Sequence, residues 1–329
     1  MPIVPSSVGD LRATAVPPHI FLPRGMIVPE EQILLYLLAR DAWSGDGEIV
    51  DAGAFCGASA YAFAAGVLDN PRHVQRAKRV HSFDLFIVDD SYTRDYIQNC
   101  FYFYTGPQGE QKFPKRQVIP GESFLDIFQF QTQRFAEQIV ERPGSILDVA
   151  WPDMPIQILF IDVAKTLEIQ QHLFRHFLPR LLPGGVLIQQ DFHHAWHPYI
   201  HVAMEYLAPC FEITQSRVGA TRAYRLRQPI PEAMLRRVVE HDFTAQETGE
   251  LMARCVLHAP ESEQPLLQVV QARQLMLSGN ADGLRALVHS FAERWAALPG
   301  FDWYLRELSA AAGAEVAVAV AVATLPPKT

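Results

Sequence analysis

The sequence contains little of what several large classes of protein depend on. No dense run of Lys and Arg occurs, and 28 basic residues are outnumbered by 36 acidic ones, which gives a formal net charge of −8. Proteins that bind nucleic acid or anionic membrane surfaces concentrate positive charge in one stretch or on one face. We therefore expect neither nucleic acid nor a membrane among the partners of this chain.

Cysteines and long apolar segments are also scarce. The four cysteines are scattered without the spacing of a metal or redox motif, so we expect reduced thiols and a cytoplasmic protein. The first residues show no basic start followed by an apolar core, and no secretory signal is expected. The Ala/Val-rich stretch at residues 310–325 contains Glu315 and is shorter than the ~20 apolar residues that span a bilayer.

Short apolar strands alternate with helices through the middle of the chain. The stretch at residues 156–162 is apolar on both faces, as in a buried parallel sheet. Residues 211–218 and 221–227 are separated by Gly219-Ala220 and are typical of an antiparallel hairpin. The pattern predicts an α/β fold, a Rossmann-like, mainly parallel sheet with a terminal antiparallel hairpin and helices on both faces. The other predicted strands are 48–53, 79–84, 139–146 and 186–191, and the main predicted helices are 57–68 and 166–182.

Three regions are predicted along the chain. Residues 1–46 form a proline-rich lead-in and a helix that begins near Pro29, because a proline followed by two glutamates suits the first helical turn. Residues 47–229 form the Rossmann-like domain, which carries an insertion at about 86–135. Residues 230–329 form a helical appendage with an Ala/Val-rich tail, because apolar residues recur there at helical spacing. We expect these C-terminal helices to serve as a lid or as the surface of a homo-oligomer.

The first strand ends in a glycine turn with the pattern D-x-G-x-x-x-G, from Asp51 through Gly53 to Gly57. Glycine lets the backbone adopt positive φ and approach a ligand closely, and the helix that follows offers unpaired N–H groups to a carboxylate. Asp51 is placed to hold an ammonium group. A ligand that carries both groups fits this turn better than a dinucleotide, whose pyrophosphate is held by G-x-G-x-x-G. Taken alone, the pattern fits a purely structural turn equally well.

A second acid, Asp84, closes the second predicted strand. An acid at this position can accept hydrogen bonds from both ribose hydroxyls of a nucleoside, because ligands of open α/β sheets bind at the carboxyl ends of the strands. A helix cap or a surface turn is the alternative role for this residue. Two acids at successive strand ends are stronger evidence for a nucleoside ligand than either acid alone.

With these residues the chain resembles the class I S-adenosylmethionine (SAM)-dependent methyltransferases over about residues 48–227. The resemblance includes the strand at 156–162, the Leu-Pro-Gly-Gly turn at 182–185 before the next strand, and the terminal hairpin. Within that family the chain is most similar to the macrocin-type sugar O-methyltransferases and uncharacterised relatives. The resemblance implies SAM as the cofactor, bound by Asp51, Gly53, Phe55, Gly57, Ser59, Asp84, Leu85 and Asp162.

The next two strand ends carry residues for the acceptor side of such a reaction. Asp162 and Lys165 follow the fourth strand, and Gln190 and Asp191 end the fifth. In metal-dependent O-methyltransferases, acids at these strand ends hold a divalent cation and a D-x-x-K step places a lysine as the base. Mg²⁺ held by Asp162 and Asp191 would lower the pKa of an acceptor hydroxyl, and Lys165 would need a lowered pKa to take the proton. Gln190 stands where those relatives carry an acid, which weakens the attraction for a dication, so we expect turnover that is independent of metal or only stimulated by it.

Four histidines and two aromatic residues follow the fifth strand. Histidine titrates near neutral pH and is the commonest general base, so His193 and His194 join Lys165 and Asp191 as potential catalytic residues. The two aromatic side chains could stack on a sugar or an aromatic acceptor. Packing at the strand end is the alternative role for all of them, and the spacing matches no zinc template. The six residues are His193, His194, Trp196, His197, Tyr199 and His201.

We expect a SAM-dependent methyltransferase, an enzyme of EC class 2.1.1, that methylates a hydroxyl on a sugar-containing or other small natural-product acceptor. Alignment of oxygen, methyl and sulfonium would supply much of the acceleration. A non-catalytic SAM-fold protein that acts as a binding or interaction module is the alternative, and Gln190 favours it mildly. An NAD-linked oxidoreductase is disfavoured because Asp84 lies 27 residues after Gly57 (84 − 57), beyond the ~20 of a dinucleotide site.

Overall fold

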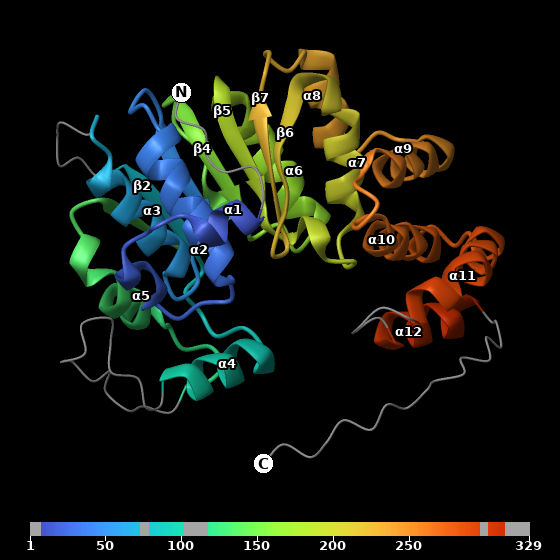
Figure 1. Ribbon diagram of the computed structural model, residues 1–329, viewed down its shortest axis with the longest axis horizontal. Helices are drawn as coiled ribbons and strands as arrows, with labels where there is room; N and C mark the ends of the chain where they lie inside the picture. Colours follow the sequence, from blue (N-terminus) through green and yellow to red (C-terminus); the bar gives the residue numbers. More distant parts are fainter. Residues whose placement is uncertain (1–7, 73–78, 102–117, 297–301, 313–329) are drawn as a thin grey trace. The chain divides into compact units, whose positions relative to one another are not determined.

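The structure, a computed structural model, describes residues 8–72, 79–101, 118–296 and 302–312. The chain forms two compact units (Figure 1). The first unit comprises the chain up to residue 193 together with residues 206–242, and the second comprises residues 194–205 and the chain from residue 243 onward. The sheet and the predicted strand-end acids all lie in the first unit.

A seven-stranded sheet forms the centre of the first unit, in the order β3-β2-β1-β4-β5-β7-β6. The first five strands in this order are mutually parallel, and β7 runs antiparallel to both β5 and β6. This arrangement confirms the prediction of a Rossmann-like, mainly parallel sheet with an antiparallel terminal hairpin. The strands are β1 (Glu48–Ala52), β2 (Val80–Asp84), β3 (Ile139–Pro143), β4 (Ile156–Ile161), β5 (Leu181–Gln189), β6 (Phe211–Val218) and β7 (Thr221–Leu226).

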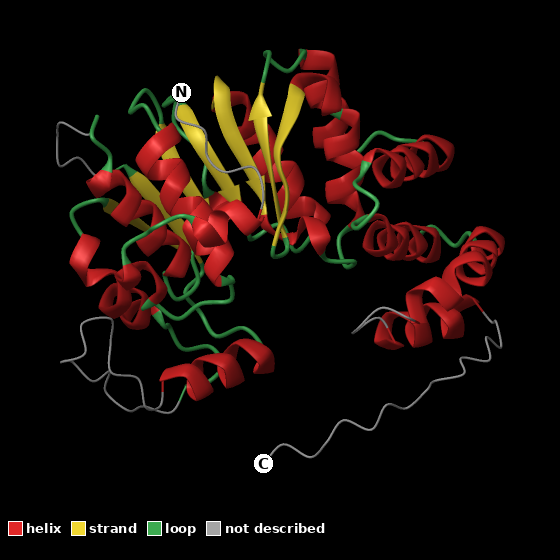
Figure 2. Cartoon of the chain, in the orientation of Figure 1, coloured by secondary structure: helices red, strands yellow, loops and turns green. Residues whose placement is uncertain are grey.

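Helices flank this sheet (Figure 2). Helix α2 (Pro29–Leu37) packs against α3 (Ala58–Asp69), whereas α6 (Leu167–His176) packs against α8 (Glu232–Glu240). The small residues of α3 have a packing reason, because a Cβ at Gly66 would collide with the Tyr36 carbonyl of α2. The backbones of the two helices therefore approach closely, and α3 is buried from its first residue through Val67.

Two predicted boundaries differ from the structure. The helix predicted at 166–182 ends at His176, because Pro179 cannot continue an α-helix and disfavours helical backbone at the residue before it. Strand β5 therefore begins at Leu181 and includes the Leu-Pro-Gly-Gly segment. The third strand ends at Pro143, ahead of Gly144 with its positive φ of 123°, rather than at residue 146.

The predicted insertion contains two described helices, α4 (Ser91–Phe101) and α5 (Leu125–Thr132). Residues 102–117 lie outside the described part of the chain. The aromatic residues that gave this stretch no clear period form a cluster in which the ring of Phe124 contacts Phe55 at 5.4 Å and Phe86 at 5.8 Å, centroid to centroid. The insertion therefore packs against the glycine turn that follows β1.

The described part of the second unit is helical. It contains α7 (Pro198–Tyr206) up to Glu205, then α9 (Ala245–His258), α10 (Gln264–Leu277), α11 (Ala281–Ala296) and α12 (Asp302–Ala312), with successive helices from α9 to α12 packed together. Helix α8, which follows the predicted domain boundary at residue 230, belongs to the first unit, and residues 194–205 belong to the second. No helix among the described residues is long and apolar enough to cross a membrane. The Ala/Val-rich tail from residue 313 lies outside the described residues.

Candidate active site

The glycine turn after β1 has three residues with positive φ: Gly53 at 104°, Phe55 at 44° and Gly57 at 99°. A Cβ at Gly53 would lie 2.8 Å from the backbone carbon of Asp162, which follows β4. A Cβ at Gly57 would lie 2.7 Å from the side chain of Thr132 on α5. The glycines are therefore required by close contacts within the protein, and the first of them brings the turns after β1 and β4 together.

Asp84, at the end of β2, holds two residues in a backbone conformation that residues other than glycine rarely adopt. Its carboxylate accepts the N–H of Phe55 at 2.9 Å and the N–H of Phe86 at 2.8 Å. Both phenylalanines have positive φ, 44° and 51°, and such strain persists only where the surroundings impose it. Asp84 thus ties the turn after β1 to the end of β2. Burial raises the pKa of the Asp84 carboxyl, although the two N–H donors oppose the shift. The next residue, Leu85, is exposed.

Asp51 is completely buried beneath the turn. One carboxylate oxygen accepts the hydroxyls of Ser59 at 3.1 Å and Ser82 at 3.2 Å. The other oxygen has no hydrogen-bond partner among the described residues. Burial raises the pKa of Asp51 to about 7, and the two hydroxyls oppose the shift only in part. An unsatisfied buried acceptor of this kind fits a cationic donor, so the residues present fit the ammonium end of SAM, directly or through water.

Lys165 lies between the two predicted acceptor-side carboxylates. Its Nζ donates to Asp162 at 2.9 Å and also to Asp191. Burial alone would lower the pKa of Lys165, but the two carboxylates outweigh that effect and raise the pKa above its ordinary value. A base needs the opposite shift. In this arrangement Lys165 is a fixed cation, and the two carboxylates accept its hydrogen bonds.

The same geometry fits Mg²⁺ poorly. A dication between Asp162 and Asp191 would have to displace the ammonium group that already bridges them. The neighbouring Gln190 offers a neutral amide in place of a third carboxylate. Among the described residues, no group of three or more His, Cys, Asp or Glu side chains is arranged to hold a metal ion. The residues present therefore do not fit a divalent cation.

The predicted histidines divide between the two units. The backbone N–H of His193 donates to the carbonyl of Ala220, in the turn between β6 and β7, at 2.9 Å. His193 therefore lies at the same edge of the sheet as Asp191. His194 begins the second unit, where Tyr199 lies within hydrogen-bond distance of His197, with the Tyr199 hydroxyl 3.1 Å from Nδ1.

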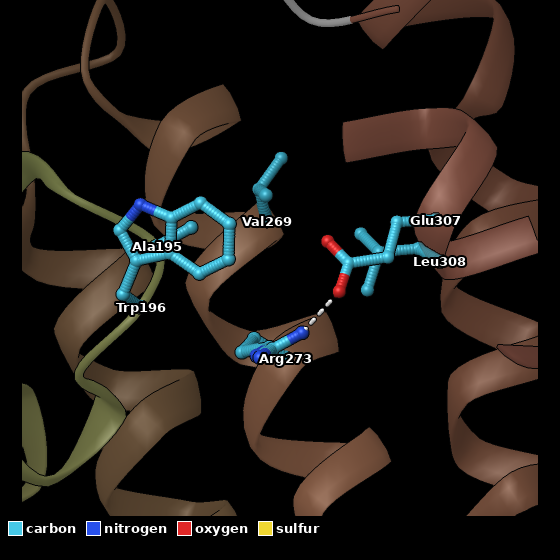
Figure 3. Close-up of a pocket in the computed structure, with 6 residues that line it drawn as sticks. All are labelled: Ala195, Trp196, Val269, Arg273, Glu307 and Leu308. Atoms are coloured by element: carbon cyan, nitrogen blue, oxygen red, sulfur yellow. Dashed lines mark hydrogen bonds and ion pairs between the residues drawn. The ribbon is translucent and has the colours of Figure 1, made fainter. Parts of the chain in front are cut away.

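The second unit contains a small cavity beside Trp196 (Figure 3). The guanidinium of Arg273 lies 5.4 Å from the centroid of the Trp196 ring and pairs with Glu307 at 2.5 Å. The cavity measures about 10 Å³, which is the space of one water molecule. Trp196 is therefore engaged by a cation in this unit, and the cavity is too small to admit a sugar.

Two buried side chains at the site were not predicted from the sequence. Gln131 of α5 donates from Nε2 to the carbonyl of Cys56 in the glycine turn, and its Oε1 accepts the N–H of Arg24 from the lead-in. Glu31 of α2 binds the turn between β6 and β7. The sequence signal for Glu31 is its place at the third position of a helix start, where a carboxylate caps the helix. Nothing local indicates its second contact.

Known proteins provide an independent comparison. Residues 50–192 match a family model described as a methyltransferase domain. No curated protein matches the sequence.

Several solved structures match the chain at low sequence identity. The chain is similar to the O-methyltransferase NovP, with 15% identity over 60% of this chain and 80% of that one and a TM-score of 0.44. It is similar to the calicheamicin methyltransferase CalS11, with 16% identity over 66% and 89% of the two chains and a TM-score of 0.43. An O-methyltransferase from Bacillus cereus in complex with SAH shares 16% identity over 68% and 93% of the two chains, with a TM-score of 0.35.

Proposed function

Residues 50–192 match a family model described as a methyltransferase domain, and we propose that the chain transfers the methyl group of SAM to a hydroxyl oxygen of a small acceptor. The observation that carries the proposal is the pair of acids at neighbouring strand ends, Asp51 with an unsatisfied buried oxygen and Asp84 beside the glycine turn. Ligands of open α/β sheets bind at this edge.

The cofactor would lie over the ends of β1 and β2. Asp51 would receive the ammonium group, and the start of α3, which has no side-chain cap at Gly57, would face the carboxylate. Asp84 would accept the ribose hydroxyls with the lone pairs that its two backbone donors leave free. The exposed side chain of Leu85 would cover the adenine base of SAM. When bound, SAM supplies an electrophilic methyl group on a sulfonium.

The acceptor would lie over the ends of β4 and β5. As its oxygen forms the new bond to the methyl carbon, the carbon–sulfur bond breaks, its electron pair stays on sulfur, and the hydroxyl proton must leave. Asp191 or His193 would take that proton. The ammonium of Lys165 would stabilise the negative charge that develops on the oxygen, because a fixed cation needs no reorganisation during the reaction.

A sugar-containing or other small natural-product acceptor is the finer part of the proposal. It is supported by the resemblance of the strand-end motifs to the macrocin-type sugar O-methyltransferases. Gln190 supports a second candidate, a SAM-fold protein without activity, because the neutral amide removes a charge from the acceptor side.

Calorimetry with SAM and S-adenosylhomocysteine, with NAD as a control ligand, tests the cofactor. We expect the first two to bind and NAD to give no heat. Transfer of a radiolabelled methyl group to methyl α-L-rhamnoside, methyl β-D-glucoside and catechol then tests the reaction. Absence of binding by either SAM or its product would refute the proposal, and binding without transfer to any hydroxyl would favour the second candidate.

A further inference from the structure

Glu31 is a buried carboxylate that lies outside the matched domain and beside its acceptor end. It belongs to the first turn of α2, and only 2% of it is exposed. Its Oε2 accepts the N–H of Val28 at 2.8 Å, as in an ordinary helix cap. Its Oε1 accepts the N–H of Ala220 at 3.2 Å and the hydroxyl of Thr221 at 2.7 Å, both 189 or more residues further along the chain.

A helix cap alone does not account for this second set of contacts. A capping glutamate needs one oxygen for the backbone N–H and can leave the other in water. Burial of a carboxylate costs free energy unless its oxygens are hydrogen-bonded. Here all three partners are donors, which only a carboxylate can satisfy with both oxygens, because an amide would turn an N–H₂ group toward one of them.

The contact leaves no space between α2 and the turn. A Cβ at Gly219 would lie 2.8 Å from the carboxyl carbon of Glu31 and 2.8 Å from the Val28 side chain. Gly219 has φ of 61°, so glycine suits the position for its backbone as well. The turn is therefore fixed against the helix from both sides of the contact.

The turn between β6 and β7 also contacts the segment that follows β5. Ala220 donates its backbone N–H to Glu31, and its carbonyl accepts the N–H of His193 at 2.9 Å. His193 lies two residues after Asp191, whose carboxylate accepts a hydrogen bond from the Lys165 ammonium. Hydrogen bonds thus connect α2 through Ala220 to His193, and the chain itself connects His193 to Asp191.

We propose that Glu31 is a positioning residue for methyl transfer, which holds the turn between β6 and β7 and thereby sets the place of Asp191 and His193. This inference rests on the proposed function. Glu31 acts through Ala220 and touches neither the cofactor nor the acceptor. Its loss should lower kcat and leave SAM affinity unchanged, because the hydrogen bonds of Asp51 and Asp84 at the cofactor end do not involve Glu31.

Glu31→Gln tests the proposal, with Glu30→Gln as its matched control. Glu30 is the preceding residue of the same helix and pairs with Arg12 instead. With the probe that the wild type methylates fastest, we expect Glu31→Gln to lower kcat about 10-fold or more, a loss of ~1.4 kcal/mol in transition-state stabilisation. The Kd for SAM should stay within twofold, and Glu30→Gln should match the wild type in both.

Thr221 provides a second pair of variants for use if Glu31→Gln folds poorly. Thr221→Val removes the hydroxyl at nearly constant volume, and Thr221→Ser retains it. We expect the valine variant to lower kcat and the serine variant to restore it.

Hydrogen exchange provides a readout independent of turnover. The backbone N–H groups of Ala220 and His193 should exchange at least several-fold faster in Glu31→Gln than in Glu30→Gln. Unchanged exchange and kcat would overturn the inference, as would an equal loss of SAM affinity, which would mark Glu31 as a residue of the fold only. Failure of the wild type to methylate any probe would overturn the proposed function, whatever the exchange result.

Discussion

The two ends of the site hold their carboxylates in opposite ways. At the cofactor end, Asp51 and Asp84 accept only neutral donors, two hydroxyls and two backbone N–H groups. At the acceptor end, Asp162 and Asp191 share the ammonium of Lys165. The carboxylates of the cofactor end therefore have no cation of the protein as a partner, and a ligand that brings a cation fits them. The acceptor end contains its own cation, Lys165, which we propose stabilises the negative charge that develops on the acceptor oxygen.

The largest effect should come from a change that disrupts both ends at once. Gly53→Val would place a branched side chain at φ of 104° and against the backbone of Asp162, where strain alone costs about 1–3 kcal/mol. We expect SAM binding to be lost in calorimetry and the melting temperature to fall by several degrees. Gly279→Val is the control, because Gly279 also has positive φ, 71°, with nothing within 4 Å of its Cβ position. Equal SAM affinity in both variants would show that the turn tolerates displacement.

A smaller effect should separate ligand binding from structure at the cofactor end. Asp84→Asn replaces one acceptor oxygen with a donor, opposite the N–H of Phe55 or Phe86. We expect SAM to bind about 10- to 150-fold more weakly, the ~1.5–3 kcal/mol of a hydrogen bond to a charged group. We also expect the free energy of unfolding of the apo protein to fall by ~1–2 kcal/mol, because the strained phenylalanines lose part of their support. Calorimetry and thermal melting measure the two losses separately, and loss of stability without loss of affinity would leave Asp84 a structural residue.

These two predictions show where sequence reasoning succeeds. The succession of strands and helices along the chain, the glycine turn and the strand-end acids follow from local patterns, because hydrophobic alternation and turn residues depend on a few neighbouring positions. The structural role of Asp84 does not follow, because it depends on the backbone of Phe55, 29 residues away. Glu31 and the turn at Ala220 are 189 residues apart, and no local pattern reports such a contact. The helix at 166–182 was predicted too long because the Pro-Gly-Gly at its expected end outweighed Pro179 inside it.

A further effect, which develops only as the pH rises, should appear in the pH dependence of apo stability. Burial raises the pKa of Asp51 from 3.8 to about 7. A carboxyl whose pKa is higher in the folded state stabilises the fold below the unfolded pKa, and that contribution is lost as the pH rises through the folded pKa. Between about pH 4 and 7 the wild type should therefore lose stability relative to Asp51→Asn, by roughly 2–4 kcal/mol at most. Thermal melts of both proteins from pH 4 to 8 measure this difference, and saturating SAM should reduce it. Parallel curves without ligand would mean that Asp51 does not titrate in this range.

The smallest effect is expected from removal of divalent metal, and it tests the acceptor end. Lys165 already supplies one positive charge between Asp162 and Asp191. Mg²⁺ would have to expel that ammonium and would gain no third carboxylate at Gln190. Since Mg²⁺ favours charged oxygen ligands and dehydrates reluctantly, we expect EDTA to change the rate of methyl transfer by less than about twofold. Lys165→Met provides the matched test: it removes the ammonium and leaves the two carboxylates facing each other, so activity should fall and added Mg²⁺ should restore part of it. Complete inactivation of the wild type by EDTA, reversed by Mg²⁺, would show that the dication displaces Lys165 in the working enzyme. The carboxylates at both ends of the site would then bind a cation that the protein itself does not supply.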